Sequence, residues 1–242
     1  MNNKLIKISV IGNSVAIRVR PPQKYPDNQN YTQLLEEKLN LDLREQLVLI
    51  NSIANGGDTV NDMLSNLDHY IRSFPNFYIL NIGVVDASTR EIPKCFFNII
   101  NNKKEGFCRN FLKLLYNGII KKQRRLIVLL SGKRTWISKS RFRKAYTTLV
   151  SNLIKETNAR IITLSINKGN SRIEKEVPGS IENYTIYSEI IKEISEQYGA
   201  SYISLDDLES DSHFPDGVHF SKEGHEIVAE KLAAEIKHLL KQ

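Results

Sequence analysis

The stretch KLIKISVIGNS at residues 4–14 decides the fold, because it combines an apolar strand with a sharp turn at Gly12. Further runs rich in Ile, Val and Leu follow it, and segments of helical character separate these runs. Strands of this kind are typical of a parallel sheet that helices cover on both faces. The sequence therefore predicts an α/β protein built as a three-layer α/β/α sandwich.

The remaining elements continue this alternation along the chain. We predict strands at 4–11, 46–53, 76–82, 125–130 and 159–165, with a short sixth element at 201–204. We predict helices at 31–39, 59–73, 105–122, 139–157, 181–198 and 221–240, and a less regular segment at 92–102. Nothing in the pattern demands two domains, so residues 1–242 are predicted to form one domain with an insertion or lid around 87–118.

The composition is that of an ordinary globular chain, with 242 residues of which 41% are hydrophobic and 25% charged. The first residues lack the apolar core and the cleavage site of a signal peptide. No apolar run approaches the roughly 20 residues of a membrane span. Cys95 and Cys108 are the only cysteines, which argues against a disulfide scaffold or a zinc cluster. These features predict a cytoplasmic protein without a membrane span.

Positive charge is concentrated in one part of the chain. The formal net charge is +7, and the segment from Lys103 to Lys144 holds fourteen Lys or Arg and one acid, Glu105. Such a segment is either a solvated basic surface or a face that attracts a phosphorylated or acidic substrate. A nucleic-acid partner is not predicted, because the regular aromatic residues of a single-strand binder and any known nucleic-acid motif are missing.

The segment FPDGVHF at residues 214–220 carries the strongest chemical signal. Asp216 precedes His219 by three residues, so its carboxylate can orient the imidazole and set its tautomer. The ring can then act as general base to a hydroxyl from another part of the fold. Ser14 directly follows the first strand and is the candidate hydroxyl. The pair therefore predicts an acyl-transfer enzyme with a serine nucleophile.

Other candidates follow predicted strands, and active residues of parallel sheets gather at the carboxyl ends of the strands. Gly57 follows the second strand, Asp86 the third, and the loop 131–138 the fourth. In that loop Arg134 and Trp136 are candidate substrate contacts. We therefore expect four segments, including Ser14, to converge on one edge of the sheet.

Each of these residues also has a purely structural interpretation. A turn serine such as Ser14 often satisfies only local backbone groups, and His219 also suits a partly buried structural role. The pairing of the two favours the catalytic interpretation. His213 and His225 lie nearby, but the three histidines match no known ligand spacing, so no metal site is predicted. No cofactor is predicted either.

The order of these blocks resembles that of the SGNH (GDSL-type) hydrolases. The similar blocks are ISVIGNS at 8–14, NGGDT at 55–59, NIGVVD at 81–86 and DGVH at 216–219. The resemblance covers most of the chain and implies a flavodoxin-like fold with a five-stranded, mainly parallel sheet. It also implies that Ser14 is the nucleophile and that Ser14 and Gly57 supply backbone N–H groups to an oxyanion hole.

The third block departs from the family pattern, because Val85 stands where an oxyanion-hole Asn is usual. Three explanations remain open. Another donor replaces the Asn, with Ser88 and Arg90 nearest in sequence; the chain belongs to a divergent branch with a Gly-Val-Val-Asp block; or activity is weak or absent. The block is similar to that of a branch found among bacterial surface-polysaccharide genes. Asp86 is kept as a possible site residue, although it is equally suited to cap a helix.

These observations leave three functions open. The leading prediction is a serine esterase that removes a short acyl group, such as acetyl, from a carbohydrate or a surface-polysaccharide precursor. Its substrate is a small-molecule or carbohydrate ester, with an anionic or phosphorylated carrier as one option. The alternatives are an O-acyltransferase that acts on a sugar with the same residues, and a catalytically silent carbohydrate-binding protein. The oligomeric state, the acyl group and the alcohol are not predicted.

Overall fold

A central parallel sheet organises the structure, which is a computed structural model that describes residues 4–101 and 106–242. The strand order is β2-β1-β3-β4-β5, and all neighbouring strands run parallel. The strands are β1 (Lys4–Gly12), β2 (Gln46–Ala54), β3 (Phe77–Asn81), β4 (Arg160–Leu164) and β5 (Ser201–Ile203). The predicted α/β class with a five-stranded parallel sheet is confirmed.

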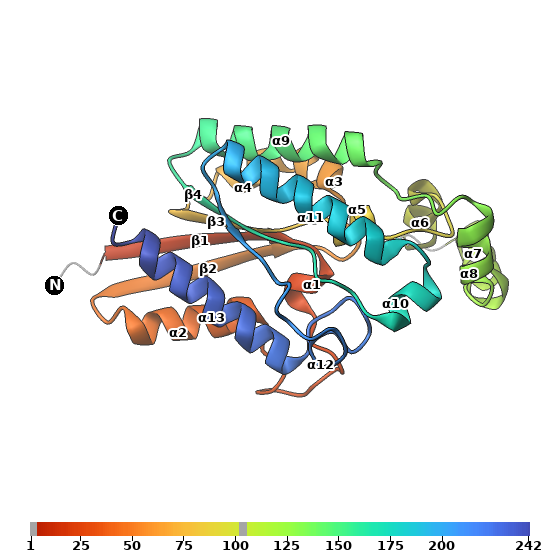
Figure 1. The fold of residues 1–242 in the computed structure, drawn as a ribbon, viewed down its shortest axis with the longest axis horizontal. Coiled ribbons are helices and arrows are strands. Elements are labelled where there is room, and N and C mark those ends of the chain that lie inside the picture. Colours follow the sequence, from red (N-terminus) through yellow and green to blue (C-terminus); the bar gives the residue numbers. More distant parts are fainter. Residues whose placement is uncertain (1–3, 102–105) are drawn as a thin grey trace.

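Helices cover both faces of the sheet and complete the three predicted layers (Figure 1). One face carries α2 (Tyr31–Asp42) and α13 (Lys222–Leu239). The other face carries α3 (Val60–Ser65), α4 (Leu67–Ile71), α9 (Lys139–Glu156) and α11 (Ser180–Gln197). Four short helices lie near the carboxyl ends of the strands: α1 (Ser14–Ile17), α5 (Val84–Ala87), α10 (Ser171–Glu176) and α12 (Ser210–His213).

The core follows from the apolar pattern of the strands and of the long helices. All five residues of β3 are buried, as expected for a strand at the centre of a sheet covered on both faces. In α9 the buried residues recur at helical spacing, with Phe142, Tyr146, Leu149 and Leu153 on one face. Burial of each such side chain stabilises the fold by about 1.5–3 kcal/mol relative to exposure.

One predicted strand is wrong, because residues 125–130 form the helix α8 (Arg124–Leu130). Only Val128 of this helix is buried, whereas the inner strands β3 and β4 are buried along almost their whole length. A short apolar run fits either element, so periodicity alone could not distinguish them. The fourth strand of the sheet is instead β4, at residues that we predicted as the fifth strand. The loop 131–138 therefore follows a helix and not a strand.

The helices differ from the predicted ones in smaller ways. The predicted helix 59–73 divides at Asn66 into α3 and α4, and the irregular segment 92–102 contains the helix α6 (Lys94–Asn101). The predicted helix 105–122 is α7 (Phe107–Leu115) followed by a π-helical turn, η1 (Tyr116–Ile120). Residues 102–105, within the predicted lid, lie outside the described residues. None of the described helices is both long and apolar enough to span a membrane.

We call residues 94–101 and 106–130 the helical wall. Its elements α6, α7 and α8 stand beyond the carboxyl ends of the strands, at the right of Figure 1. The wall overlaps the segment 87–118 predicted as an insertion or lid and continues twelve residues past it. Whether it moves as a lid stays a prediction.

The strand order reverses at β1, and this places a crevice at the carboxyl ends of the first three strands. Gly12 pairs with Ala54 of β2 and with Asn81 of β3, so all three strands end at the same level. A Cβ at Gly12 would lie 3.1 Å from the Asn81 carbonyl oxygen and 3.2 Å from the Ala16 Cβ. The absence of a side chain thus permits the chain to turn sharply beside β3.

Candidate active site

The segment after β1 presents the Ser14 hydroxyl at this crevice. Asn13 is buried and its side chain accepts a hydrogen bond of 3.2 Å from the backbone N–H of Val15, which caps the short helix α1. Ser14 is the first residue of α1, so its own N–H has no acceptor within the helix. The strand and the cap together fix the position of the hydroxyl.

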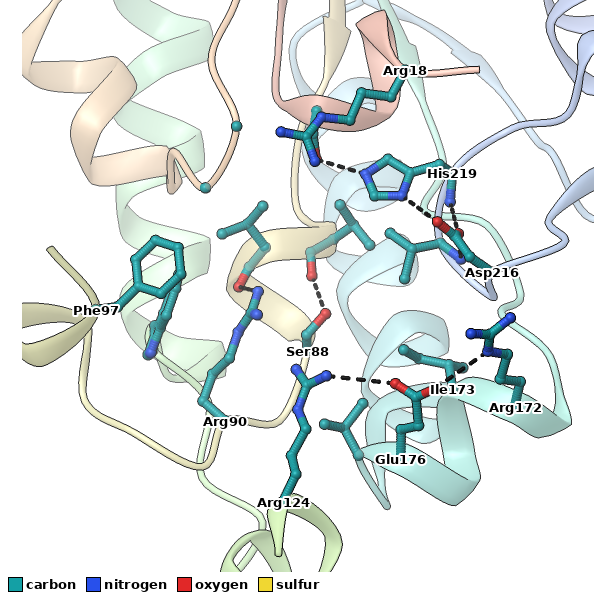
Figure 2. Close-up of a pocket in the computed structure, with 18 of the residues that line it drawn as sticks. Arg18, Ser88, Arg90, Phe97, Arg124, Arg172, Ile173, Glu176, Asp216 and His219 are labelled. Carbon is teal, nitrogen blue, oxygen red and sulfur yellow. Dashed lines mark hydrogen bonds and ion pairs between the residues drawn. The ribbon is translucent and has the colours of Figure 1, made fainter. Parts of the chain in front are cut away.

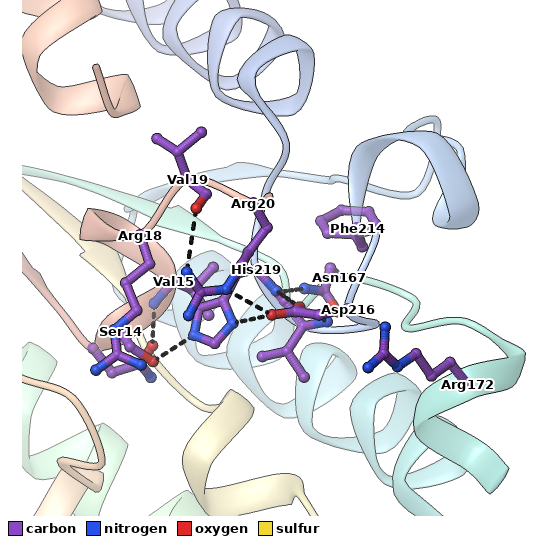
Figure 3. A network of polar contacts seen from close by, with 12 residues as sticks. Ser14, Val15, Arg18, Val19, Arg20, Asn167, Arg172, Phe214, Asp216 and His219 are labelled. Atoms are coloured by element: carbon purple, nitrogen blue, oxygen red, sulfur yellow. Dashed lines mark hydrogen bonds and ion pairs between the residues drawn. The ribbon is translucent and has the colours of Figure 1, made fainter. Parts of the chain in front are cut away.

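His219 contacts Ser14 from the opposite end of the chain (Figure 3). Its Nε2 lies 2.9 Å from the Ser14 Oγ, and its Nδ1 lies 2.8 Å from the Asp216 Oδ2. With the Nδ1–H donated to the carboxylate, Nε2 is left to accept the hydroxyl proton of Ser14. The structure therefore brings together Ser14, His219 and Asp216, the three residues that the sequence analysis expected to act together.

The Asp216 carboxylate is held by several donors. Its Oδ1 accepts the backbone N–H groups of Val218 at 3.0 Å and His219 at 2.8 Å, and its Oδ2 lies 3.1 Å from the Arg20 Nε. Burial raises the pKa of Asp216, but the hydrogen bonds from His219 and Val218 outweigh burial and hold this pKa well below its usual range. Asp216 is thus charged near neutrality and favours the tautomer of His219 described above.

Two asparagines after β4 position the loop that carries Asp216 and His219. The Asn170 side chain donates to the Phe214 carbonyl at 2.9 Å, and the Asn167 side chain donates to the Val218 carbonyl at 2.5 Å. Between them Gly217 has a φ of +82°, and a Cβ there would lie 2.6 Å from the Asn170 Oδ1. Glycine is required at this position for both reasons.

Two backbone N–H groups at this edge of the sheet are without a hydrogen-bond partner among the described residues. Gly57 lies in the turn after β2 with a φ of +88°, and a Cβ there would lie 3.2 Å from the Phe97 ring. Neither the N–H of Gly57 nor that of Ser14 donates a hydrogen bond within residues 4–101 and 106–242. Free, fixed donors of this kind suit an oxyanion.

Position 85, where the family usually has an oxyanion-hole Asn, offers no side-chain donor in this protein. Val85 lines the cavity and its side chain has no donor. The Ser88 hydroxyl donates to the Val84 carbonyl at 2.6 Å and lies 2.8 Å from the Tyr184 hydroxyl, so its single proton is already used. The Arg90 Nη2 donates to the Val85 carbonyl at 3.1 Å, and its Cζ lies 4.1 Å from the centre of the Trp136 ring.

A cavity of about 480 Å³ opens beside Ser14 and His219 (Figure 2). Most of the predicted site residues line it: Ser14, Gly57, Ser88, Arg90, Trp136, Asp216 and His219. Asp86 and Arg134 do not. The Asp86 Oδ1 accepts the Val60 N–H at 3.0 Å inside the core, and burial raises the pKa of Asp86 to about 7. The Arg134 Nη2 donates to the Glu91 carbonyl at 3.2 Å, outside the cavity.

Sequence reasoning missed several residues of this cavity: Arg18, Phe97, Arg124, Arg172 and Glu176. Arg18 and the neighbouring Arg20 lie just beyond α1, four and six residues after Ser14, and the Arg20 N–H donates to the Phe220 carbonyl at 2.8 Å. Residues 167–176 follow β4, so the rule about carboxyl ends of strands could have found Arg172 and Glu176. The cations of the helical wall carried no such signal, since only the packed structure shows which of them faces the cavity.

The two other histidines near Ser221 have structural contacts. His225 is buried, accepts the Tyr31 N–H at 3.1 Å and lies 3.2 Å from the Arg18 carbonyl, and burial lowers its pKa to about 4. The His213 Nδ1 accepts the Glu209 N–H at 2.9 Å. Among the described residues, no group of three or more His, Cys, Asp or Glu side chains is placed to hold a metal ion.

Solved structures with the same fold are known. A lipase/acylhydrolase from Enterococcus faecalis superposes with a TM-score of 0.65 at 17% sequence identity, covering 96% of each chain. Axe2, an acetylxylan esterase from Geobacillus stearothermophilus, superposes with a TM-score of 0.64 at 17% identity, covering 97% of this chain and 95% of its own. At this identity the likeness concerns the fold. No curated protein matches the sequence significantly.

The sequence itself matches a family model over most of its length. The model of the GDSL-like Lipase/Acylhydrolase family covers residues 10–227, which include most of the first quoted block and all of the other three. The predicted resemblance and the predicted class of serine ester hydrolase are confirmed at the level of this family. The chain belongs to the GDSL-like lipase/acylhydrolase family.

Proposed function

We infer that this protein is a serine esterase in which Ser14 is the nucleophile, His219 the general base and Asp216 the residue that orients the base. The observation that carries this proposal is the continuous chain of hydrogen bonds from the Ser14 hydroxyl through His219 to Asp216. Ser14 and His219 lie 205 residues apart in the sequence, so local chain geometry does not account for their contact.

The geometry implies a two-step reaction. The Ser14 Oγ attacks the ester carbonyl carbon while its proton passes to the His219 Nε2, and the Asp216 carboxylate stabilises the imidazolium. The C–O bond to the alcohol then breaks, and the alcohol leaves with the proton from Nε2. Water then attacks the acyl-enzyme and gives a proton to the His219 Nε2. The bond from the acyl carbon to the Ser14 Oγ breaks, the acid leaves, and Nε2 returns the proton to Oγ, which restores the hydroxyl.

The negative oxygen of each tetrahedral intermediate would lie between the N–H groups of Ser14 and Gly57. Because Val85 offers no donor, this site has one side-chain donor fewer than the usual pattern of the family. Removal of a single oxyanion donor typically costs about a hundred- to a thousandfold in rate. We therefore expect measurable but modest turnover of simple esters.

A short acyl group on a carbohydrate is the substrate that fits best. The cavity is about 480 Å³, and charged side chains share its lining with apolar ones such as Val85, Phe97 and Ile173. The Geobacillus enzyme is described as acting on acetylated xylo-oligosaccharides, and its catalytic mutants replace a serine, an aspartate and a histidine. Acetyl as the acyl group, a surface-polysaccharide precursor as its carrier and a cytoplasmic location stay predictions.

Labelling by a fluorophosphonate probe tests the nucleophile directly. The wild type should be labelled, and Ser14→Ala should lose both labelling and about 10⁴-fold or more of its esterase activity. Ser9→Ala is the matched control, since this serine lies in β1, the strand that leads to Ser14, and its hydroxyl contacts Ser73 at 3.0 Å instead of His219. A Ser14→Ala protein with full esterase activity would refute the proposal.

Product analysis separates hydrolysis from transfer. The wild type is given an acetylated sugar with and without an excess of unacetylated acceptor sugar. Release of acetate at the same rate in both mixtures supports hydrolysis. Formation of a newly acetylated acceptor at the expense of acetate would identify an O-acyltransferase that uses the same residues.

A further inference from the structure

The charged side chains around the cavity carry more positive than negative charge. Four arginines line it, Arg18, Arg90, Arg124 and Arg172, together with two carboxylates, Glu176 and Asp216. Asp216 is already bound to His219 and Arg20. A cavity beside a candidate nucleophile thus has an excess of guanidinium groups.

Two of the four arginines have carboxylate partners. The Arg124 Nε lies 3.0 Å from the Glu91 Oε2, and its Nη1 lies 3.6 Å from the Glu176 Oε2. The Arg172 Nε lies 3.3 Å from the Glu176 Oε1. These cations are neutralised within the wall of the cavity (Figure 2).

Arg90 has no such partner. Its guanidinium donates to the Val85 carbonyl and stacks on Trp136, but its Nε is buried without any hydrogen bond. Asp86 and Glu91 act on it only from beyond ion-pair distance, and burial lowers the pKa of its guanidinium. Arg90 as a whole is half-buried, and a cation that is partly removed from water without a carboxylate is unfavourable unless something else compensates its charge.

Arg18 is the second unpaired cation. Its guanidinium has no hydrogen bond or ion pair within the described part of the chain. The Arg18 Nη2 and the Ser14 Cβ lie 3.4 Å and 3.7 Å from the point where a Cβ on Gly56 would stand, so the guanidinium flanks the nucleophile. The Arg18 carbonyl, 3.2 Å from the His225 Nε2, fixes the backbone there. Figure 2 shows Arg18 on the His219 side of the pocket and Arg90 on the Phe97 side.

We propose that this cavity binds an ester whose scissile group is attached to an anion, a carboxylate or a phosphate, which Arg90 and Arg18 bind. The proposal rests on the proposed function and specifies its substrate class. Guanidinium groups bind both anions through paired hydrogen bonds, and the Trp136 ring holds the Arg90 fork in one plane. The anion belongs either to the acyl group or to the alcohol, and both sources use the same chemistry.

Matched pairs of esters test this inference. The acyl arm compares 4-nitrophenyl hemisuccinate with 4-nitrophenyl acetate, and the alcohol arm compares a mono-O-acetyl hexose phosphate with the same acetylated hexose. The measured quantity is the ratio of kcat/KM for the anionic ester to that for the neutral ester. We expect a ratio of about 10 or more in one arm, which identifies the source of the anion. A ratio of one or less in both arms would overturn the inference.

Variants assign the effect to the unpaired cations. Arg90→Met should lower the ratio about 10- to 100-fold in the responding arm, mainly through KM, and Arg90→Lys should restore part of it. Arg134→Met is the matched control, because this arginine lies outside the cavity and should leave the ratio unchanged. An equal loss on anionic and neutral esters would instead make Arg90 an oxyanion donor, and an equal effect of Arg134→Met would indicate only a diffuse positive field. Either result contradicts the inference.

A measurement on the wild type alone covers the case in which Arg90 variants do not fold. Inorganic phosphate should competitively inhibit hydrolysis of the neutral ester and protect Ser14 from the fluorophosphonate probe. The absence of both effects at millimolar phosphate would overturn the inference. The proposed function fails separately, if no ester is hydrolysed and Ser14 is not labelled.

Discussion

The catalytic edge of the sheet and the helical wall beside it are built in opposite ways. At the edge, formed by residues 12–20, 55–58, 83–90 and 214–220, the hydroxyl, imidazole and carboxylate of the candidate triad are bonded to one another within the chain. In the wall, large apolar side chains face outward: Phe107 is 87% exposed, Leu114 72% and Leu130 79%. The edge is therefore fixed by the core, whereas the wall is held at a few points.

Several of these points lie next to the cavity. Arg124 of α8 and Tyr116 of η1 both bind the buried Glu91, at 3.0 Å and 2.6 Å. Phe97 of α6 packs against Trp136, with ring centres 4.8 Å apart. We therefore propose a division of roles, in which the edge performs the chemistry and the wall limits which substrate reaches it.

The largest effect that this comparison predicts is at Asp216. Asp216→Asn should keep the fold of the loop but disturb the tautomer of His219, which lowers kcat by roughly 10³- to 10⁴-fold. The measurement is kcat for a neutral ester, with thermal unfolding of the same protein as the control. A loss below about tenfold would mean that the carboxylate is not needed for the chemistry of the edge, and the contrast with the wall would weaken.

The next effect concerns stability, because the edge contains a carboxylate that does not favour folding. Asp86 is buried, its Oδ2 has no partner among the described residues, and burial raises its pKa to about 7. The unfolded chain loses this proton near pH 4, while the folded chain keeps it until about pH 7. Unfolding therefore releases a proton in this window, and the contribution of Asp86 to stability is present at low pH and is lost as the pH rises.

Comparison with Asp86→Asn isolates this contribution. As the pH rises from about 4 to 7, the free energy of unfolding of the wild type should fall relative to that of the variant by up to about 4 kcal/mol. Above pH 7 the difference should stay constant. Urea denaturation of both proteins at several pH values measures it. A difference that does not change with pH would show that Asp86 is charged in the folded protein throughout the window.

Sequence patterns predicted the edge far better than the wall, for a physical reason. The carboxyl ends of parallel strands lie at one level. Recognition of the first three strands in the sequence was therefore enough to predict that the turn after β1 and the residues after β2 and β3 lie close together. Short strands with Gly turns, such as 4–14, signal this directly. The contact of His219 with Ser14 could then be predicted from the Asp-x-x-His spacing and from the position of this motif before the last helix.

The helical wall and the partners of the side chains at the edge could not be predicted, because no comparable rule applies to them. Residues 125–130 were predicted as a strand because Leu-Ile-Val-Leu-Leu suits a strand as well as a helix, and only the covering layers decide between them. The basic segment from Lys103 to Lys144 left an anion-attracting face as one of two options and did not indicate which cation would form it. In the structure Arg124 is neutralised and Arg134 points elsewhere, while Arg18 and Arg90, outside that segment, remain unpaired.

The smallest predicted effect is on the outer face of the helical wall, where a substitution tests whether solvent or another protein chain covers this face. Leu114→Gln replaces an exposed side chain of α7 by a polar one of similar helix propensity, so the free energy of unfolding should change by no more than about 0.5 kcal/mol. Leu149→Ala in the buried face of α9 is the contrasting variant and should cost about 2–5 kcal/mol. Urea denaturation at two protein concentrations measures both. If Leu114→Gln destabilised the protein as a core variant does, and more so at high concentration, another copy of the chain would cover this face. The wall would then be an interface with its own buried core, and the contrast between it and the catalytic edge would disappear.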